Sequence, residues 1–124
     1  MKESRSKIRI PIYDSEIILI LTDDIDKSCS KVYKSRKWKD KYVKGEGDAE
    51  GCFLFDHSDV GYYYIVLPVT PSLLLINHET LHAAFIILSH HDVVLTVDNH
   101  EALTYLHGHI FERVLKRTKK WQTV

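Results

Sequence analysis

The sequence predicts a single α+β domain over residues 1–124, with a small antiparallel or mixed sheet of about four strands and three helices. Three observations lead to this class. The chain has 124 residues, the length of one ordinary domain. A hydrophobic fraction of 44% and a charged fraction of 27% suffice for one core and exclude disorder as the main state. Segments typical of strands and helices follow one another in the order β-β-α-β-β-α-α.

The first half of the chain predicts a β-hairpin, a helix and an acidic, glycine-rich loop, at residues 7–12 and 16–22, 24–37, and 45–51. The first strand alternates polar and apolar side chains and contains Pro11, which belongs at a sheet edge or a strand end. The second strand is β-branched, which favours a more buried position. Asp23 and Asp24 offer N-cap chemistry to the helix, whose apolar residues recur at helical spacing.

The second half predicts two more strands and two long helices, at residues 52–56 and 61–68, 71–90, and 101–117. Thr70 and Pro71 are typical of a helix start, and Asp98 or Asn99 can cap the last helix. The helix over 71–90 is apolar nearly all round, so we expect it to be central and covered on most sides. The basic residues 116–124 are expected to fray.

Charge and hydropathy exclude several classes of protein. Lys and Arg number 17, as do Asp and Glu, so the formal net charge of +0 disfavours a nucleic-acid binder. No apolar run approaches the ~18 residues that span a bilayer, and the charged N-terminus lacks a signal core. We therefore expect a cytoplasmic protein with no membrane partner. Cys29 and Cys52 form no Cys-x-x-Cys motif and are expected to be plain buried or half-buried thiols.

Histidine is the unusual residue of this chain. Seven of the 8 histidines fall within residues 78–109, and residues 78–82 read His-Glu-Thr-Leu-His inside a predicted helix. Residues four apart lie on one helix face, so the imidazoles of His78 and His82 can converge on one zinc ion. Glu79 is rotated by about 100° from His78 and can reach a water on the metal as a general base. We expect both histidines to be more than half buried.

A catalytic zinc site also needs a third protein ligand and one open position. The downstream candidates are Asp98, His100, Glu101, His107 and His109. We favour Glu101, which lies 19 residues after His82 at the start of the next helix, where the chain has room to turn back. His100 and His107 point away from the helix face of Glu101, whereas Asp98 and Tyr105 lie close to it.

His78-Glu79-x-x-His82, with Glu101 and Ala102 on a following helix, resembles the zincin metallopeptidases in their gluzincin arrangement. It is similar to minimal gluzincins, to the ImmA/IrrE-like peptidases, and to short metallopeptidases of phages and prophages. The resemblance covers about residues 60–115 and implies a small sheet packed on a central motif helix. It implies that His78, His82 and Glu101 bind Zn²⁺ and that Glu79 is the catalytic base. It does not fix the residue that stabilises the transition state or orients a ligand, for which the candidates are Asp98, Tyr105, His107 and His109.

Three functions follow from the sequence. The first is a zinc-dependent hydrolase, a small metallopeptidase that acts on a peptide or protein held at a strand edge near residues 61–69. The second is a non-catalytic, metal-stabilised accessory protein of a phage or prophage. The third is a nucleic-acid-binding module, because residues 31–44 hold seven Lys and Arg interleaved with Trp38 and Tyr42.

Overall fold

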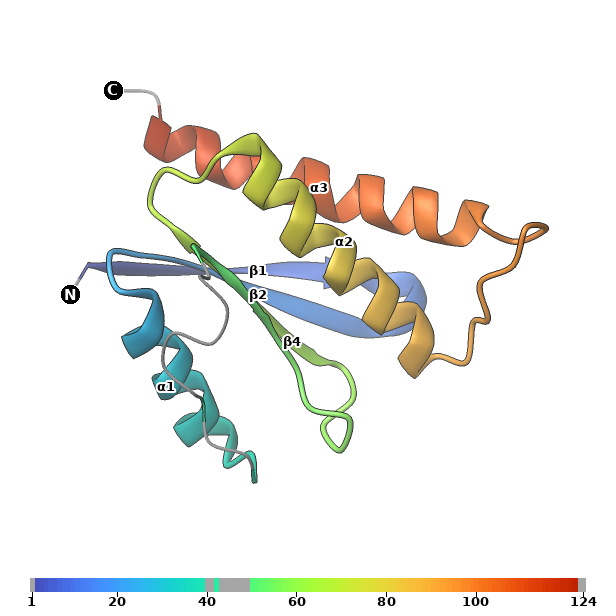
Figure 1. The fold of residues 1–124 in the computed structure, drawn as a ribbon, viewed down its shortest axis with the longest axis horizontal. Helices are drawn as coiled ribbons and strands as arrows, with labels where there is room; N and C mark the ends of the chain where they lie inside the picture. Colours follow the sequence, from blue (N-terminus) through green and yellow to red (C-terminus); the bar gives the residue numbers. More distant parts are fainter. Residues whose placement is uncertain (1, 40–41, 43–49, 123–124) are drawn as a thin grey trace.

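The computed structural model describes residues 2–39, 42 and 50–122 (Figure 1). In this part of the chain four strands form one mixed sheet, accompanied by three α-helices, which confirms the predicted α+β class. The elements in chain order are β1 (Glu3–Ile10), the 3₁₀ turn η1 (Pro11–Tyr13), β2 (Ser15–Thr22), α1 (Ile25–Arg36), β3 (Cys52–Leu54), β4 (Tyr62–Pro68), α2 (Leu73–His90) and α3 (Glu101–Gln122). Most of the loop expected at residues 45–51 lies outside the described residues.

The sheet has the strand order β1-β2-β4-β3. β1 and β2 form the predicted antiparallel hairpin, β4 runs parallel to β2, and β3 is antiparallel to β4. β4 is therefore paired on both sides, so the expectation of a free strand edge near residues 61–69 is wrong. The chain returns through α1 and β3 before β4 pairs with β2, which leaves β3 rather than β4 at the edge.

β1 begins and ends earlier than the predicted strand over residues 7–12. Its first half, Glu3 to Ser6, is polar and shows no apolar alternation, yet it pairs with β2 as far as Glu3 opposite Thr22. The strand ends at Ile10 because Pro11 has no N–H to donate to a ladder and instead starts η1.

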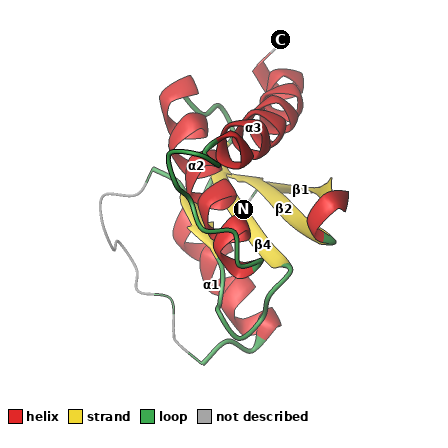
Figure 2. Cartoon of the chain, turned by 90° about the vertical axis from the view of Figure 1, so that its right-hand side faces the viewer, coloured by secondary structure: helices red, strands yellow, loops and turns green. Residues whose placement is uncertain are grey.

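The helices cover both faces of the sheet (Figures 1 and 2): α2 and α3 pack on one face, and α1 packs on the other. Between the sheet and the α2–α3 pair lies the larger core, which includes Ile8, Ile17, Leu19, Tyr63, Ile65, Ile76, Ala83, Ile87, Leu106, Ile110 and Val114. A smaller cluster under α1 contains Ile20, Cys29, Val32, Leu54, Tyr64 and Val66.

Side chains next to the first turn cap the N-terminal ends of α1 and α2. Asp24 caps α1 as predicted, since its carboxylate accepts from the Lys27 N–H at 3.1 Å. α2 begins at Leu73 and is capped by Ser72 rather than by Thr70, because the Ser72 hydroxyl accepts from the Leu75 N–H.

α3 is longer than expected, because its backbone remains helical to Gln122 instead of ending near residue 117. Tertiary contacts hold this last part against β1: the Arg117 guanidinium donates to the Lys7 carbonyl at 2.9 Å, and the Thr118 side chain is buried. The prediction ended this helix near residue 117 because the sequence of residues 116–122 shows basic charge and gives no sign of the contacts with β1.

α2 is not covered on most sides, which corrects the prediction from its apolar sequence. It lies in an outer layer with the sheet and α3 on one side only, so Leu74 is 80% exposed and Phe85 is 51% exposed. Although α2 is apolar, neither it nor any other helix in the described residues has the length and hydropathy to cross a bilayer.

Candidate metal centre

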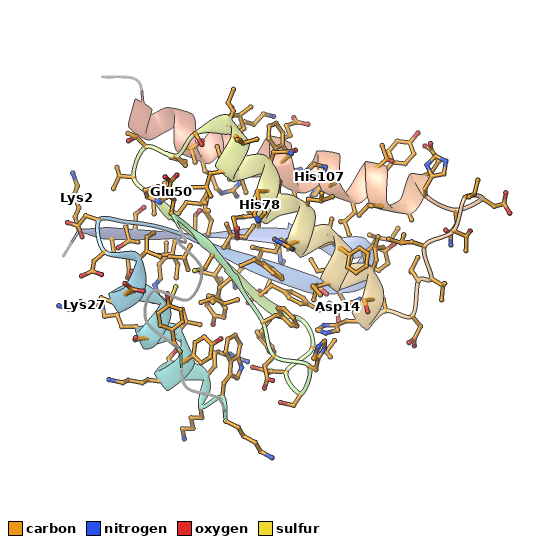
Figure 3. All side chains as sticks on the ribbon, viewed as in Figure 1. Lys2, Asp14, Lys27, Glu50, His78 and His107 are labelled. Carbon is orange, nitrogen blue, oxygen red and sulfur yellow. The ribbon has the colours of Figure 1, made fainter. Side chains whose placement is uncertain are left out.

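His78, Glu79 and His82 lie in the middle of α2, where Figure 3 labels His78. The helix brings the two histidine side chains together on one face. The Nε2 atoms of His78 and His82 are 3.2 Å apart, and their ring centroids are 4.7 Å apart at an interplanar angle of 81°. The two imidazoles therefore converge, as the spacing of four residues predicts.

The separation of these two nitrogens fits a shared metal ion. Two imidazole nitrogens bound to a tetrahedral zinc at ~2.0–2.1 Å lie about 3.3 Å apart. The observed 3.2 Å is close to this value. This separation is compatible with one shared ion, and it also allows a hydrogen bond between the two imidazoles.

The expectation that His78 and His82 are both more than half buried is wrong. The His78 side chain is 64% exposed and His82 is also exposed, because both lie on the outer face of α2. Leu81 and Phe85 share this face and are 41% and 51% exposed. The site is open to solvent and to a large ligand.

The Glu79 side chain is turned from the exposed histidine face toward the protein interior, as its rotation of about 100° around the helix allows. Its side chain is only 7% exposed, and its Oε1 lies 3.7 Å from the His78 Nε2. Burial raises the pKa of Glu79, while the nearby charges of His78 and His82 oppose that rise. The charge of Glu79 also raises the pKa of the Cys52 thiol of β3. Its raised proton affinity suits a general base.

Glu101, the predicted third ligand, does not join this pair. Among the described residues, no three His, Cys, Asp or Glu side chains lie close enough together to hold a metal ion. α3 runs back past α2 after a long connection, and its first residue lies at the far end of α3, away from the middle of α2 (Figure 1). It reaches the level of the motif only at His107, whose Nε2 is 3.1 Å from the Thr80 hydroxyl. The 19-residue spacing alone did not reveal this offset between the helices.

The other candidates lie apart from one another. Asp98 is exposed in the turn before α3, and Tyr105 is 75% exposed. His109 faces η1 and the end of β1, where its Nε2 is buried without a hydrogen-bond partner. His107, which the helix-face argument had set aside, contacts the motif helix through Thr80.

The structure also shows a second histidine group, at the C-terminal end of α2. The His90 Nε2 lies 2.9 Å from the His57 Nδ1, and the His90 Nδ1 lies 2.8 Å from the Tyr63 hydroxyl. Burial lowers the pKa of His90, and the positive charges of His57 and His91 lower it further. His57 lies in a turn far away in sequence, so no local pattern predicts this contact.

No family model, curated protein or solved structure matches this chain. The similarity to zincin metallopeptidases therefore depends on the motif residues alone.

Proposed function

We propose that this protein is a zinc-dependent hydrolase, a small cytoplasmic metallopeptidase that cleaves a peptide or protein. If a phage encodes it, the host cytoplasm is its compartment. The observation that carries the proposal is the 3.2 Å separation of the His78 and His82 Nε2 atoms, with the Glu79 carboxylate 3.7 Å from the first of them.

Each motif residue has a distinct role in this proposal. His78 and His82 bind the zinc ion through Nε2. Zinc at this position supplies a Lewis acid that polarises the scissile carbonyl and lowers the pKa of water. Glu79 accepts the proton of the attacking water and passes it to the leaving amine. The raised pKa of Glu79 supports this role, because a carboxylate with higher proton affinity is a stronger base.

Glu101 remains the proposed third ligand. Its support is the resemblance to gluzincins and its position at the first residue of α3, directly after the long connection from α2. For Glu101 to bind the same zinc ion, the start of α3 has to move towards His78 and His82. His107 is the alternative, because it already faces α2.

The edge strand β3 is the proposed support for the substrate backbone. β3 ends the sheet, packs beside α2, and has Cys52 within reach of the charge of Glu79. An extended peptide can pair with such a free edge through main-chain hydrogen bonds. The proposed position thus moves from β4, which is paired on both sides, to β3.

The test is Glu79→Gln, which keeps the shape of the side chain and removes the base. We expect peptide turnover to fall ~10²–10⁴-fold, because general base catalysis contributes that order. Zinc content, measured by elemental analysis, should stay unchanged. Glu112→Gln is the matched control, since this exposed glutamate of α3 pairs only with Lys116 one turn away in the described structure. Turnover that persists in Glu79→Gln, or zinc that is lost, contradicts the proposed role.

A non-catalytic, metal-stabilised accessory protein is the second candidate. It is favoured by the two-histidine geometry without a third ligand among the described side chains. In that case zinc raises the melting temperature of the wild-type protein, while no peptide or protein substrate is cleaved by wild type or by Glu79→Gln. The nucleic-acid module is less favoured because the net charge is +0.

A further inference from the structure

Two cysteines lie together under α1, although 22 residues separate them in the sequence. Cys29 is on α1 and is fully buried, whereas Cys52 begins the edge strand β3 and is only partly buried. α1 and β3 are in direct contact, and both thiols belong to the same apolar cluster. Both cysteines are free thiols in this structure.

The two thiols lie close enough to shift each other's pKa, and both belong to the same cluster. Tyr42 packs against the same cluster and affects the pKa of both thiols, and its hydroxyl donates to the Asp26 carboxylate at 2.7 Å. A tyrosine and a carboxylate thus accompany the thiol pair. These four polar side chains gather at one apolar cluster, which indicates a role for the two thiols beyond packing.

The two thiols differ in reactivity. The neighbouring Cys29 thiol lowers the pKa of Cys52, whereas the Cys52 thiol together with burial raises the pKa of Cys29. Cys52 is also the more accessible of the two. An accessible, lower-pKa cysteine beside a second thiol is the arrangement of a cysteine that reacts first and a partner that resolves the product.

We propose that Cys52 and Cys29 form a reversible redox site that reacts with peroxides and closes to a disulfide. The Cys52 thiolate attacks one peroxide oxygen, the O–O bond breaks, and Cys52 becomes a sulfenic acid while the departing oxygen takes up the proton released by Cys52 and leaves as water. The Cys29 sulfur then attacks the Cys52 sulfur, the S–O bond breaks, and the hydroxyl leaves with the Cys29 proton as a second water. Two thiols lose two electrons in all, and the peroxide gains them.

The disulfide would join α1 to β3, which packs beside α2. It therefore connects the two helical layers through an edge strand that is only three residues long. The inference does not depend on the proposed metal site, since neither sulfur is assigned to it.

Hydrogen peroxide treatment of the whole protein tests the proposal. The two cysteines are the only ones in the chain, so alkylation of free thiols and intact-mass measurement report on this pair alone. In wild type we expect both thiols to become unavailable to alkylation, with the chain monomeric, and dithiothreitol to restore both. In Cys29→Ser we expect the oxidation to stop at a sulfenic acid on Cys52 that dimedone traps. In Cys52→Ser we expect Cys29 to stay reduced.

The wild-type measurement alone can overturn the proposal, even if a variant at the buried Cys29 fails to fold. Two alkylatable thiols after peroxide treatment would show that the pair does not close. A disulfide between two chains, or dimedone labelling of wild type equal to that of Cys29→Ser, would show that Cys29 does not resolve the sulfenic acid. Cys29→Ala, which leaves an apolar residue in the cluster, repeats the trapping experiment if Cys29→Ser is unfolded.

Discussion

Two pairs of histidines on or beside α2 have similar nitrogen separations and different surroundings. In the middle of the helix, the Nε2 atoms of His78 and His82 are 3.2 Å apart on an exposed face. At its C-terminal end, the His90 Nε2 and the His57 Nδ1 are 2.9 Å apart, and the other nitrogen of His90 meets the Tyr63 hydroxyl at 2.8 Å.

Proton positions distinguish the two pairs as candidate metal ligands. The Tyr63 hydroxyl carries a proton that it can donate to the His90 Nδ1, 2.8 Å away. This assignment from the hydrogen-bond network puts the single ring proton of neutral His90 on Nε2, which then donates to the His57 Nδ1. The His90 Nε2 then has no lone pair for a metal. The close approach of the His78 and His82 Nε2 atoms, in contrast, matches the spacing of two ligands on one ion.

The strongest test of this difference is zinc binding by alanine variants at both pairs. His82→Ala removes one of the two converging nitrogens and should abolish zinc binding, measured by elemental analysis after dialysis. His57→Ala is the matched control, because His57 is also exposed and also lies beside a second histidine. We expect it to retain the zinc of wild type. Loss of zinc in His57→Ala and retention in His82→Ala would reverse the assignment.

The next test asks whether Glu101 completes the exposed pair. Loss of a partner that only orients a ligand costs ~10–100-fold in metal affinity, so loss of a ligand should cost about 100-fold or more. We expect that decrease in Glu101→Ala, measured by competition with a zinc chelator, and no change for the neighbouring His100→Ala. Equal affinities for Glu101→Ala and wild type would exclude Glu101, and His107→Ala would then be the variant to measure.

Local sequence patterns predicted most of the fold because they report on short-range physics. The hairpin, the Asp24 cap and the two long helices follow from alternation, capping and helical periodicity. The position of β4 between β2 and β3 depends on a crossover through α1, which no local pattern encodes. The exposure of Leu74 likewise depends on how many layers cover α2, so an apolar helix was wrongly expected to be buried.

In the candidate site, too, the contact within one helix could be predicted from the sequence, whereas the contacts between elements could not. The convergence of His78 and His82 is a property of one helix, and the spacing of four residues predicted it. The contact of His107 with Thr80 depends on the offset between α2 and α3, which the length of the connection does not determine. The contact between Cys29 and Cys52 joins a helix to a strand, and it carries no sequence signal beyond the presence of two cysteines.

The smallest expected effect concerns the pH dependence of stability at the second pair. The pKa of His90 lies below its usual 6.5, first because of burial and then because of the charges of His57 and His91. The unfolded chain therefore binds the proton more readily than the folded one. The contribution of His90 to stability is present above pH ~6.5 and is lost as the pH falls from there towards the lowered pKa.

His90→Gln removes this titration and the hydrogen bond to Tyr63. At pH 8 we expect the variant to be less stable than wild type by about 1–2 kcal/mol, the value of one or two lost hydrogen bonds. The gap should narrow as the pH falls below 6.5, because wild type loses stability there through His90 and the variant does not. Urea unfolding of both proteins between pH 5 and pH 8 measures the gap, with the exposed His100→Gln as control. A gap that stays constant over this range would show that His90 titrates alike in both states, and that the chain from Tyr63 to His57 does not hold it neutral.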